Sequence, residues 1–473
     1  MAAGTLDKSA RCSQGQTAQL FVKDLRKLRY ILLVGSIGLI GADRIDFFAA
    51  KGPFTLTPFL VMAPLVLLIS LFLSGPQGLF RLTILSSMRR QLPFLYAVGL
   101  FLFLTFGSIL FSLDPSRSLV AFTDLVLVSF LGYCISVQIL ADPEQDKLIK
   151  RSVTFALVMY LLFCVAEIIA FSQGLTLNSQ RSGSWVQSTF APSSFWRVVP
   201  ILPGTTFDAN RSGFILMMYS ALLDRFASKW RYTPLFRILI TILILLTFSR
   251  SGTLCWLAYH LCSRSFWKKV LSRRALVSAA AVAIIAFAVG FAYQNELSEL
   301  VNAWQLSNAV SAKLSMDPGS SGESHILLIE RGLKTWLTSP KTIVAGIGFA
   351  AAPQVLQDFF QDDKHGNFHS LYVTALAEMG LPAFLILMFI LVYPLFGRRG
   401  AIPCVAAIMI FNVSYQTHME PVFWLMLAMV WSFEREYLGL RSAFESNDRG
   451  GTTISAGLIS KRREKLLSSR EEF

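Results

Sequence analysis

The chain has 473 residues, of which 54% are hydrophobic and 15% are charged, whereas soluble proteins carry about 25% charged residues. This composition excludes an ordinary soluble enzyme and predicts a protein with many membrane-spanning helices. The net charge of +14 would suit nucleic-acid binding, but the basic residues gather in the connections between apolar segments, so we expect membrane lipids and no nucleic acid as partners.

The apolar segments predict an all-α integral membrane protein with about 12 transmembrane helices. Runs such as 54–73 and 275–293 contain no charged residue and reach the roughly 17 to 25 residues that cross a bilayer. We place the spans at 30–48, 54–73, 91–112, 118–140, 152–172, 212–227, 233–248, 252–267, 275–293, 371–396, 401–416 and 420–434.

The positive charges predict which side of the membrane each connection occupies. With the N-terminus in the cytoplasm, the cytoplasmic segments hold 31 of the 43 Lys and Arg residues, as the positive-inside rule requires. Residues 1–29 are then a cytoplasmic tail without a signal peptide, and 435–473 are a second cytoplasmic tail, rich in Ser, Gly and charge, that we expect to be disordered. The bundle 30–293 holds spans 1–9 and an external loop at 173–211.

A large external loop, 294–370, precedes spans 10–12 in residues 371–434. Loops longer than about 12 to 15 residues are usually functional or disordered. In "PQVLQDFFQDD", Val355 and Phe359, and likewise Leu356 and Phe360, are four residues apart. This spacing predicts an amphipathic helix, so we expect a partly helical loop at the external surface.

Two arginines lie at the external ends of spans. Arg250 stands in "LLTFSRSGTLCW", between two apolar runs, and Arg211 stands in "TTFDANRSGF". Either guanidinium could extend to lipid phosphates or hold phosphate oxygens through its planar, two-pronged donor geometry. Asp208 and Asn210 can cap the helix that follows, which leaves a structural role for Arg211 open.

Two of the five histidines, His365 and His369, lie four residues apart in "QDDKHGNFHSLYVTALAEMGLP". Gly366 and Asn367 make one helix through both histidines doubtful, and a catalytic zinc needs three protein ligands, so we expect no metal here. A histidine titrates near neutral pH and could act as a general base. Asn367 or Ser370 could cap the next helix, which Gly380–Pro382 is expected to break or kink.

These residues carry a resemblance to a known family. "HSLYVTALAEMG" has ten residues between His369 and Gly380 and resembles the His-x10-Gly signature of the O-antigen ligase and Wzy-type polysaccharide polymerase superfamily, with Ser370, Ala377 and Glu378 at its other positions. "TFSRSGTL" (247–254) resembles the family's T-x-S-R turn, and "SPKTIVAGIGF" (339–349) resembles its Gly-x-Gly segment. The resemblance covers roughly residues 200–400.

The resemblance implies a membrane glycosyltransferase that needs no metal or cofactor and inverts the anomeric carbon. Its members take a glycan from undecaprenyl diphosphate on the periplasmic face of the bacterial inner membrane. For this chain we expect lipid A–core as the acceptor. His369 would then be the base that activates the acceptor hydroxyl, Arg250 a ligand of the diphosphate, and Arg211 a weaker match for the second arginine.

The chain departs from the family pattern in the external loop. Many members have an arginine about fifteen residues before the proline of the Gly-x-Gly segment, and His325 occupies that position here. Arg331 or Lys334 could replace it. Other possible accessory residues are His365, His418 and Glu420.

Three other functions stay open from the sequence. A polymerase of the same superfamily would use another lipid-linked repeat unit as the acceptor, and a related enzyme would glycosylate proteins. From a different class, a transporter of an anionic solute would explain Asp124 and Glu167, which lie inside predicted spans. We favour buried polar pairing within the bundle for these two carboxylates.

Overall fold

The computed structural model describes residues 3–45, 56–79, 86–172, 202–206, 208–247, 249–263, 321–360, 366–395 and 400–433. Within these ranges the chain is helical and contains no strand. A helix occupies at least part of every predicted span except the span at 275–293, which lies outside the described residues. Among the described residues, four helical segments are long and apolar enough to cross a membrane: Leu92–Ile109, Pro115–Ala141, Gln145–Ile169 and Leu371–Leu395.

The helices fall into a long set, a short set and a loop set. The long set is α1 (Ala3–Gly38), α2 (Pro58–Leu79), α3 (Ser86–Ile109), α4 (Pro115–Ala141) and α5 (Gln145–Ser172). The short set is α6 (Ala209–Phe226), α7 (Thr233–Leu246), α8 (Arg250–Leu261), α18 (Ile402–Phe411) and α19 (Pro421–Phe433). The loop set is α13 (Ser321–Trp336), α14 (Pro340–Ala345) and α15 (Ala352–Phe360). The last long span stands apart from these sets and consists of α16 (Leu371–Thr374), the π-helix η2 (Ala375–Met379), α17 (Gly380–Val392) and the turn η3 (Tyr393–Leu395).

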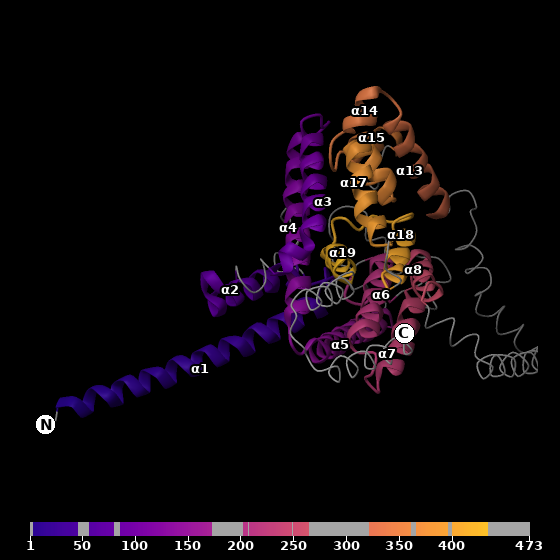
Figure 1. Cartoon of the computed structure of the whole chain (residues 1–473). Coiled ribbons are helices and arrows are strands. Elements are labelled where there is room, and N and C mark those ends of the chain that lie inside the picture. The colour runs from indigo at the N-terminus through magenta and orange to yellow at the C-terminus, as the bar shows by residue number, and fades with distance from the viewer. Residues whose placement is uncertain are drawn as a thin grey trace, which may run out of the picture.

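Helices α3, α4 and α17 stand side by side, with α14 and α15 near one end of them and α5 and α7 near the other (Figure 1). Aromatic contacts fill the space between these helices and α19. The ring centroids of Phe101 and Trp424 are 6.1 Å apart, and those of Phe94 and Trp431 are 5.4 Å apart. The end that carries α14 is the one that the charge pattern predicts to be external.

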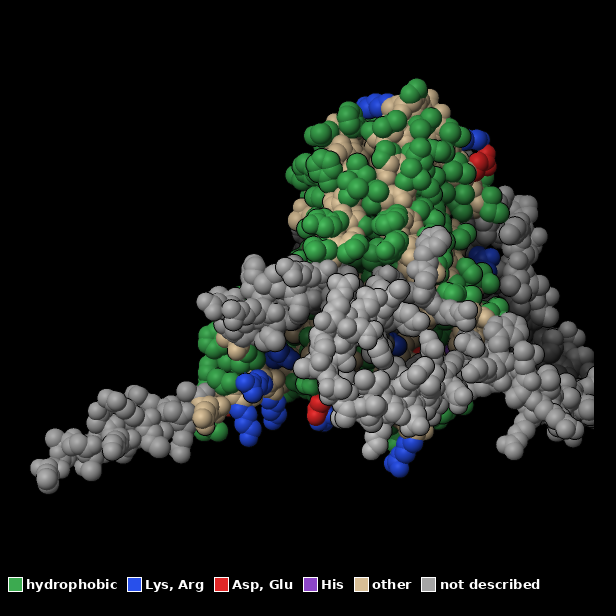
Figure 2. Space-filling model, viewed as in Figure 1, with side chains coloured by type: hydrophobic (Ala, Val, Ile, Leu, Met, Phe, Trp, Pro, Cys, Tyr) green, Lys and Arg blue, Asp and Glu red, His purple; other side chains and the backbone are tan. Residues whose placement is uncertain are grey.

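Hydrophobic side chains cover the outer surface of this part of the molecule (Figure 2). Tyr96 and Phe103 on α3 and Phe130 on α4 are largely exposed. A soluble protein rarely exposes such a continuous apolar surface. Together with the long apolar helices, it indicates a membrane protein, with these side chains facing lipid.

The last long span is broken at the predicted place. Gly380 has a φ of 81° and follows the five-residue π-helix Ala375–Met379. The Gly-x-Gly loop, residues 346–348, packs on this break: Ile347 N–H donates to the Ala377 carbonyl (2.9 Å) and Gly348 N–H to the Glu378 carbonyl (3.0 Å). The two sequence segments that resemble the superfamily therefore form one structural unit.

The loop helix expected from Val355 and Phe359 is confirmed as α15. Its Leu356 is fully buried, in a small core with Leu328 of α13 and Phe368. The segment 294–320 of the predicted loop lies outside the described residues. The described part of the loop thus packs as three helices against the broken span.

Substitution of the glycines at the break should destabilise the fold. A Cβ on Gly380 would lie 2.1 Å from the Val344 carbonyl oxygen, and one on Gly346 would lie 2.2 Å from the Glu378 carbonyl oxygen. Backbone strain alone at such a φ costs about 1 to 3 kcal/mol, so Gly380→Ala and Gly346→Ala should each lower the thermal melting temperature and the yield of folded protein. Gly107→Ala on α3 is the control, because nothing lies within 4 Å of its Cβ position; equal melting of all three variants would contradict this packing.

Candidate functional site

Two helices begin beside the turn that joins α18 and α19, and their first turns are connected by hydrogen bonds. The Ser249 hydroxyl, at the start of α8, donates to the Asn210 side chain in α6 (2.7 Å). The Ser251 and Ser414 hydroxyls are 2.7 Å apart. Helix N-termini carry partial positive charge, so they favour negatively charged groups beside them; the carboxylate of Asp208 already occupies this place at α6, whereas a neutral serine caps α8.

The broken span begins at the same place. Leu371 N–H donates to the carbonyls of Asn412 (3.1 Å) and Tyr415 (2.9 Å), and the Thr374 hydroxyl donates to Gln416 (2.9 Å). We call this meeting point the polar junction: residues 208–211, 249–251, 369–374 and 412–420. It unites the T-x-S-R turn and the His-x10-Gly motif, which are more than a hundred residues apart in the sequence.

Small residues allow α6 and α8 to approach closely. A Cβ on Gly213 would lie 2.6 Å from the Cα of Gly252, and one on Gly252 would lie 2.9 Å from the Cα of Gly213. Only glycine at both positions permits this crossing, because any Cβ would collide with backbone. The crossing brings Asn210 within reach of Ser249.

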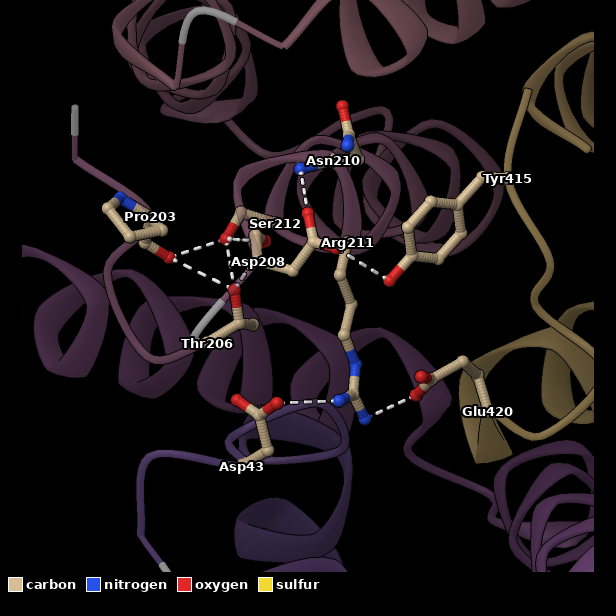
Figure 3. Close-up of polar contacts among 9 residues, drawn as sticks. All are labelled: Asp43, Pro203, Thr206, Asp208, Asn210, Arg211, Ser212, Tyr415 and Glu420. Atoms are coloured by element: carbon tan, nitrogen blue, oxygen red, sulfur yellow. Dashed lines mark hydrogen bonds and ion pairs between the residues drawn. The ribbon is translucent and has the colours of Figure 1, made fainter. Parts of the chain in front are cut away.

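The first turn of α6 is the centre of the polar junction (Figure 3). Asp208 caps the helix by accepting the Asn210 N–H (2.7 Å), and its other carboxylate oxygen accepts the Tyr415 hydroxyl (2.9 Å). Arg211 forms an ion pair with Asp43 (2.6 Å) and another with Glu420. One helical turn thus binds three segments: the end of α1, the start of α8 and the α18–α19 turn.

The two arginines singled out from the sequence have different surroundings. Carboxylates engage both terminal nitrogens of Arg211, which neutralises its charge. Arg250 is the first residue of α8 and is half-buried, and the preceding Ser249 caps the helix by accepting the Gly252 N–H (2.8 Å). Arg250 therefore places a guanidinium group at the N-terminal end of a helix.

His369 has an unusual backbone conformation. Its φ is 52°, a value that non-glycine residues rarely adopt. The Asn367 side chain accepts its N–H (2.8 Å), and its neighbours Phe368 and Ser370 are buried while His369 itself is half-buried. Strained residues of this kind cluster at functional sites, where surrounding structure holds them in place.

Glu378, which matches the family motif, has a role that its place in the sequence did not reveal. Its buried carboxylate accepts the N–H groups of Ala350 (2.9 Å) and Ala352 (3.0 Å), just beyond the Gly-x-Gly loop. Glu378 therefore fixes this loop to the span that carries His369. The one signal in the sequence was its position in the His-x10-Gly motif, two residues before Gly380.

The possible accessory residues that the structure describes lie in two regions, the α18–α19 turn and helix α13. Glu420 pairs with Arg211, and His418 is buried with its ring 5.7 Å from that of Phe349. On α13, Lys334 pairs with Glu330 (2.6 Å) and Arg331 is half-buried. His325 lies in the first turns of α13, and His365 lies outside the described residues.

Helix α13 lies directly against the residues around His369. A Cβ on Gly332 would lie 2.9 Å from the Phe368 ring and 2.4 Å from Val373. The two candidates for the missing loop arginine are Arg331 and Lys334. Arg331 directly precedes Gly332, so it is the candidate next to this contact. Among the described residues, no group of three or more His, Cys, Asp or Glu side chains could hold a metal ion.

Removal of Arg211 should destabilise the protein strongly. Arg211→Met would leave the carboxylates of Asp43 and Glu420 without a counter-charge, and breaking a buried pair in this way costs about 3 to 5 kcal/mol. The triple variant Asp43→Asn, Arg211→Met, Glu420→Gln should recover much of this loss, because it carries no unpaired charge. Thermal unfolding in detergent measures both; a triple variant that melts no higher than Arg211→Met would contradict the ion-pair account.

His418 should make the fold sensitive to acid. Burial lowers the pKa of His418 from 6.5 to about 4, so between these values the unfolded chain binds a proton that the folded chain does not. Above about pH 6.5 this residue therefore does not lower the free energy of unfolding, and as the pH falls below that value it lowers the free energy of unfolding progressively. His418→Gln should lose less melting temperature than the natural chain between about pH 7 and pH 5, whereas an equal loss in both would show that the histidine is not responsible.

Comparison with known proteins agrees with this geometry. Residues 235–388 match the family model described as O-antigen ligase. A search among curated proteins finds no match to this chain. The matched residues run from α7 to α17 and include Arg250, the Gly-x-Gly loop, Glu378 and His369. The match confirms the resemblance carried by these motifs: through residues 235–388, the chain is related to the O-antigen ligase superfamily.

Proposed function

We propose that this protein transfers a preassembled glycan from undecaprenyl diphosphate to lipid A–core at the periplasmic face of the bacterial inner membrane. The O-antigen ligase match supports a membrane enzyme of polysaccharide biosynthesis. The observation that carries the proposal is the polar junction, where hydrogen bonds of neighbouring residues join the segment of the strained His369, the segment of Arg250 and the first turn of α6.

His369 acts as the general base in this proposal. It accepts the proton of an acceptor hydroxyl while that oxygen attacks the anomeric carbon of the glycan. A new glycosidic bond forms as the bond from the anomeric carbon to the phosphate oxygen breaks, and undecaprenyl diphosphate leaves with the electron pair. Attack opposite the leaving group inverts the anomeric carbon.

The leaving group needs charge stabilisation rather than a protonating acid. Arg250 can hold diphosphate oxygens in two-pronged fashion, and the helix N-termini beside it add partial positive charge. Of the remaining arginines, Arg331 is the better candidate for a second contact, because α13 packs against Phe368, next to His369. Arg211 already has two carboxylate partners and is assigned a structural role.

A polymerase of the same superfamily would use the same chemistry with a lipid-linked repeat unit as the acceptor. Glycolipid analysis of a deletion strain separates the two: loss of attached chains with accumulation of long lipid-linked chains indicates a ligase, and single attached repeats indicate a polymerase. The transporter alternative loses one of its two residues, because Glu167 pairs with Arg44 at 2.5 Å inside the bundle.

Replacement of His369 by asparagine should abolish transfer without disturbing the fold. Asparagine tolerates the left-handed backbone conformation better than most residues, so backbone strain does not confound the result. Loss of a general base reduces the rate by about a hundredfold to ten-thousandfold, while binding of the undecaprenyl diphosphate-linked donor should persist. His260→Asn in the last turn of α8 is the matched control, and full transfer by His369→Asn would overturn the assignment of the base.

Arg250→Lys should also impair transfer, even though the charge is kept. An ammonium group cannot reproduce the two-pronged contact of a guanidinium with phosphate oxygens, so donor binding should weaken by about tenfold or more. Arg231→Lys, near the predicted cytoplasmic surface, serves as the control. Donor affinity equal to that of the natural chain would instead favour contact of Arg250 with lipid phosphates.

A further inference from the structure

A cavity of about 760 Å³ lies next to the polar junction. Its walls come from the end of α1, the start of α2, helix α4, the first turn of α6, the α18–α19 turn and the segment after the Gly-x-Gly loop. The polar side chains that line it include Asp43, Arg117, Asp124, Arg211 and Glu420.

Helix α4 presents one continuous face to this cavity. Arg117, Ala121, Asp124 and Val128 follow one another at helical spacing and all line it. Arg117 is exposed near the start of the helix, and Asp124 is half-buried, about 10 Å further along the axis at 1.5 Å per residue. The cavity therefore extends from the predicted external rim into the span.

Arg117 and Asp124 are set apart from the other charged side chains of the cavity wall, and the nearest charge that acts on Asp124 is the guanidinium of Arg211, which already pairs with Asp43 and Glu420. Neither forms an ion pair or a side-chain hydrogen bond within the described part of the chain, although both line the same cavity. By contrast, Glu167 in the neighbouring α5 pairs with Arg44 at 2.5 Å. An ionisable residue inside an apolar span is costly unless it serves a function, so Asp124, which makes no ion pair with the residues that the structure describes, points to a ligand in the cavity.

The charges of the wall decide which ligand chemistry fits. Three carboxylates and two guanidinium groups line the cavity, which suits neither a free dianion nor a metal cation. Between them lie apolar groups such as Leu60, Met419 and Pro421. Sugar rings match this mixture, because their hydroxyls donate to carboxylates and accept from guanidinium groups while their C–H faces contact apolar side chains.

A strained residue joins this cavity to the broken span. Ala350 lines the cavity with a φ of 58°, a value rare for alanine. Its N–H donates to Glu378 (2.9 Å), which lies in the His-x10-Gly motif. A ligand in the cavity would therefore contact the loop that is fixed to the His369-bearing span.

We propose that this cavity is a glycan-recognition site in which Asp124 accepts sugar hydroxyls and Arg117 donates to sugar oxygens at its mouth. The inference rests on the proposed function and names the residues that would select its sugar substrate. Arg117 and Asp124 lie outside the matched residues 235–388. The reacting groups would then come from the matched domain and sugar selection from the preceding half of the chain.

Binding to the purified full chain in lipid nanodiscs tests this site with three probes. The probes are an undecaprenyl diphosphate-linked oligosaccharide, undecaprenyl diphosphate without a glycan, and lipid A–core. Asp124→Asn, which keeps the shape of the side chain, and Arg117→Gln should each weaken binding of a glycan-bearing probe by about tenfold. Both variants should bind undecaprenyl diphosphate without a glycan as the natural chain does.

The controls are Thr123→Val, on α4 outside the cavity, and Glu144→Gln, an exposed carboxylate before α5. Selective loss of the lipid-linked oligosaccharide would identify the donor glycan as the occupant, and selective loss of lipid A–core would identify the acceptor. Unchanged affinity of both variants for both glycan-bearing probes would overturn the site.

The same measurements separate the two proposals. If the natural chain binds undecaprenyl diphosphate and the variants keep full affinity for glycans, the recognition site fails and the proposed function stands. If the natural chain does not bind undecaprenyl diphosphate but Asp124→Asn loses affinity for lipid A–core, the proposed donor fails and the sugar site is supported.

Discussion

The ion pairs of Arg211 hold together the part of the molecule on which the polar junction depends. Arg211 is 168 residues after its partner Asp43, and Glu420 lies further away in the other direction, so the two ion pairs connect segments from most of the chain at one helical turn. A guanidinium between two carboxylates in a largely buried place is stable only as a complete set. Loss of Arg211 would leave two carboxylates without a counter-charge in a region that solvates them poorly.

The two halves of the chain have different tasks in the proposed reaction. The matched domain contributes a helix N-terminus with Arg250, the broken span with His369, and the Gly-x-Gly loop that Glu378 fixes in place. The preceding half contributes Asp43, which orients Arg211, and the α4 face of the cavity.

Local patterns in the sequence predicted those features that depend on neighbouring residues. The apolar runs located the helices, the glycine followed by Pro382 located the break, and the spacing of Val355 and Phe359 located α15. The capping prediction was right in position but not in detail. Ser370 is the N-cap residue without a side-chain bond, while Asn367 accepts the His369 N–H instead.

Features that depend on distant partners could not be predicted. The sequence shows Arg211 and Glu420 as isolated charges, and only tertiary packing brings them together. Glu378 stands in an apolar run with no local partner, because its partners are backbone N–H groups about 26 to 28 residues earlier. The cavity beside α4 could not be predicted for the same reason, since its other walls come from four separate parts of the chain: residues within 40–60, Arg211, Ala350 and residues 419–421.

Because of the π-helix at Ala375–Met379, the spacing of the family motif also affects the direction in which residues face around the helix axis. A hydrogen bond in a π-helix spans five residues, whereas one in an α-helix spans four, so a π-turn holds one residue more. One residue corresponds to about 100° of rotation around a helix axis. The ten residues between His369 and Gly380 therefore set an angle as well as a length. A chain shorter or longer by one residue in this interval would keep its span but turn His369 toward a different neighbour.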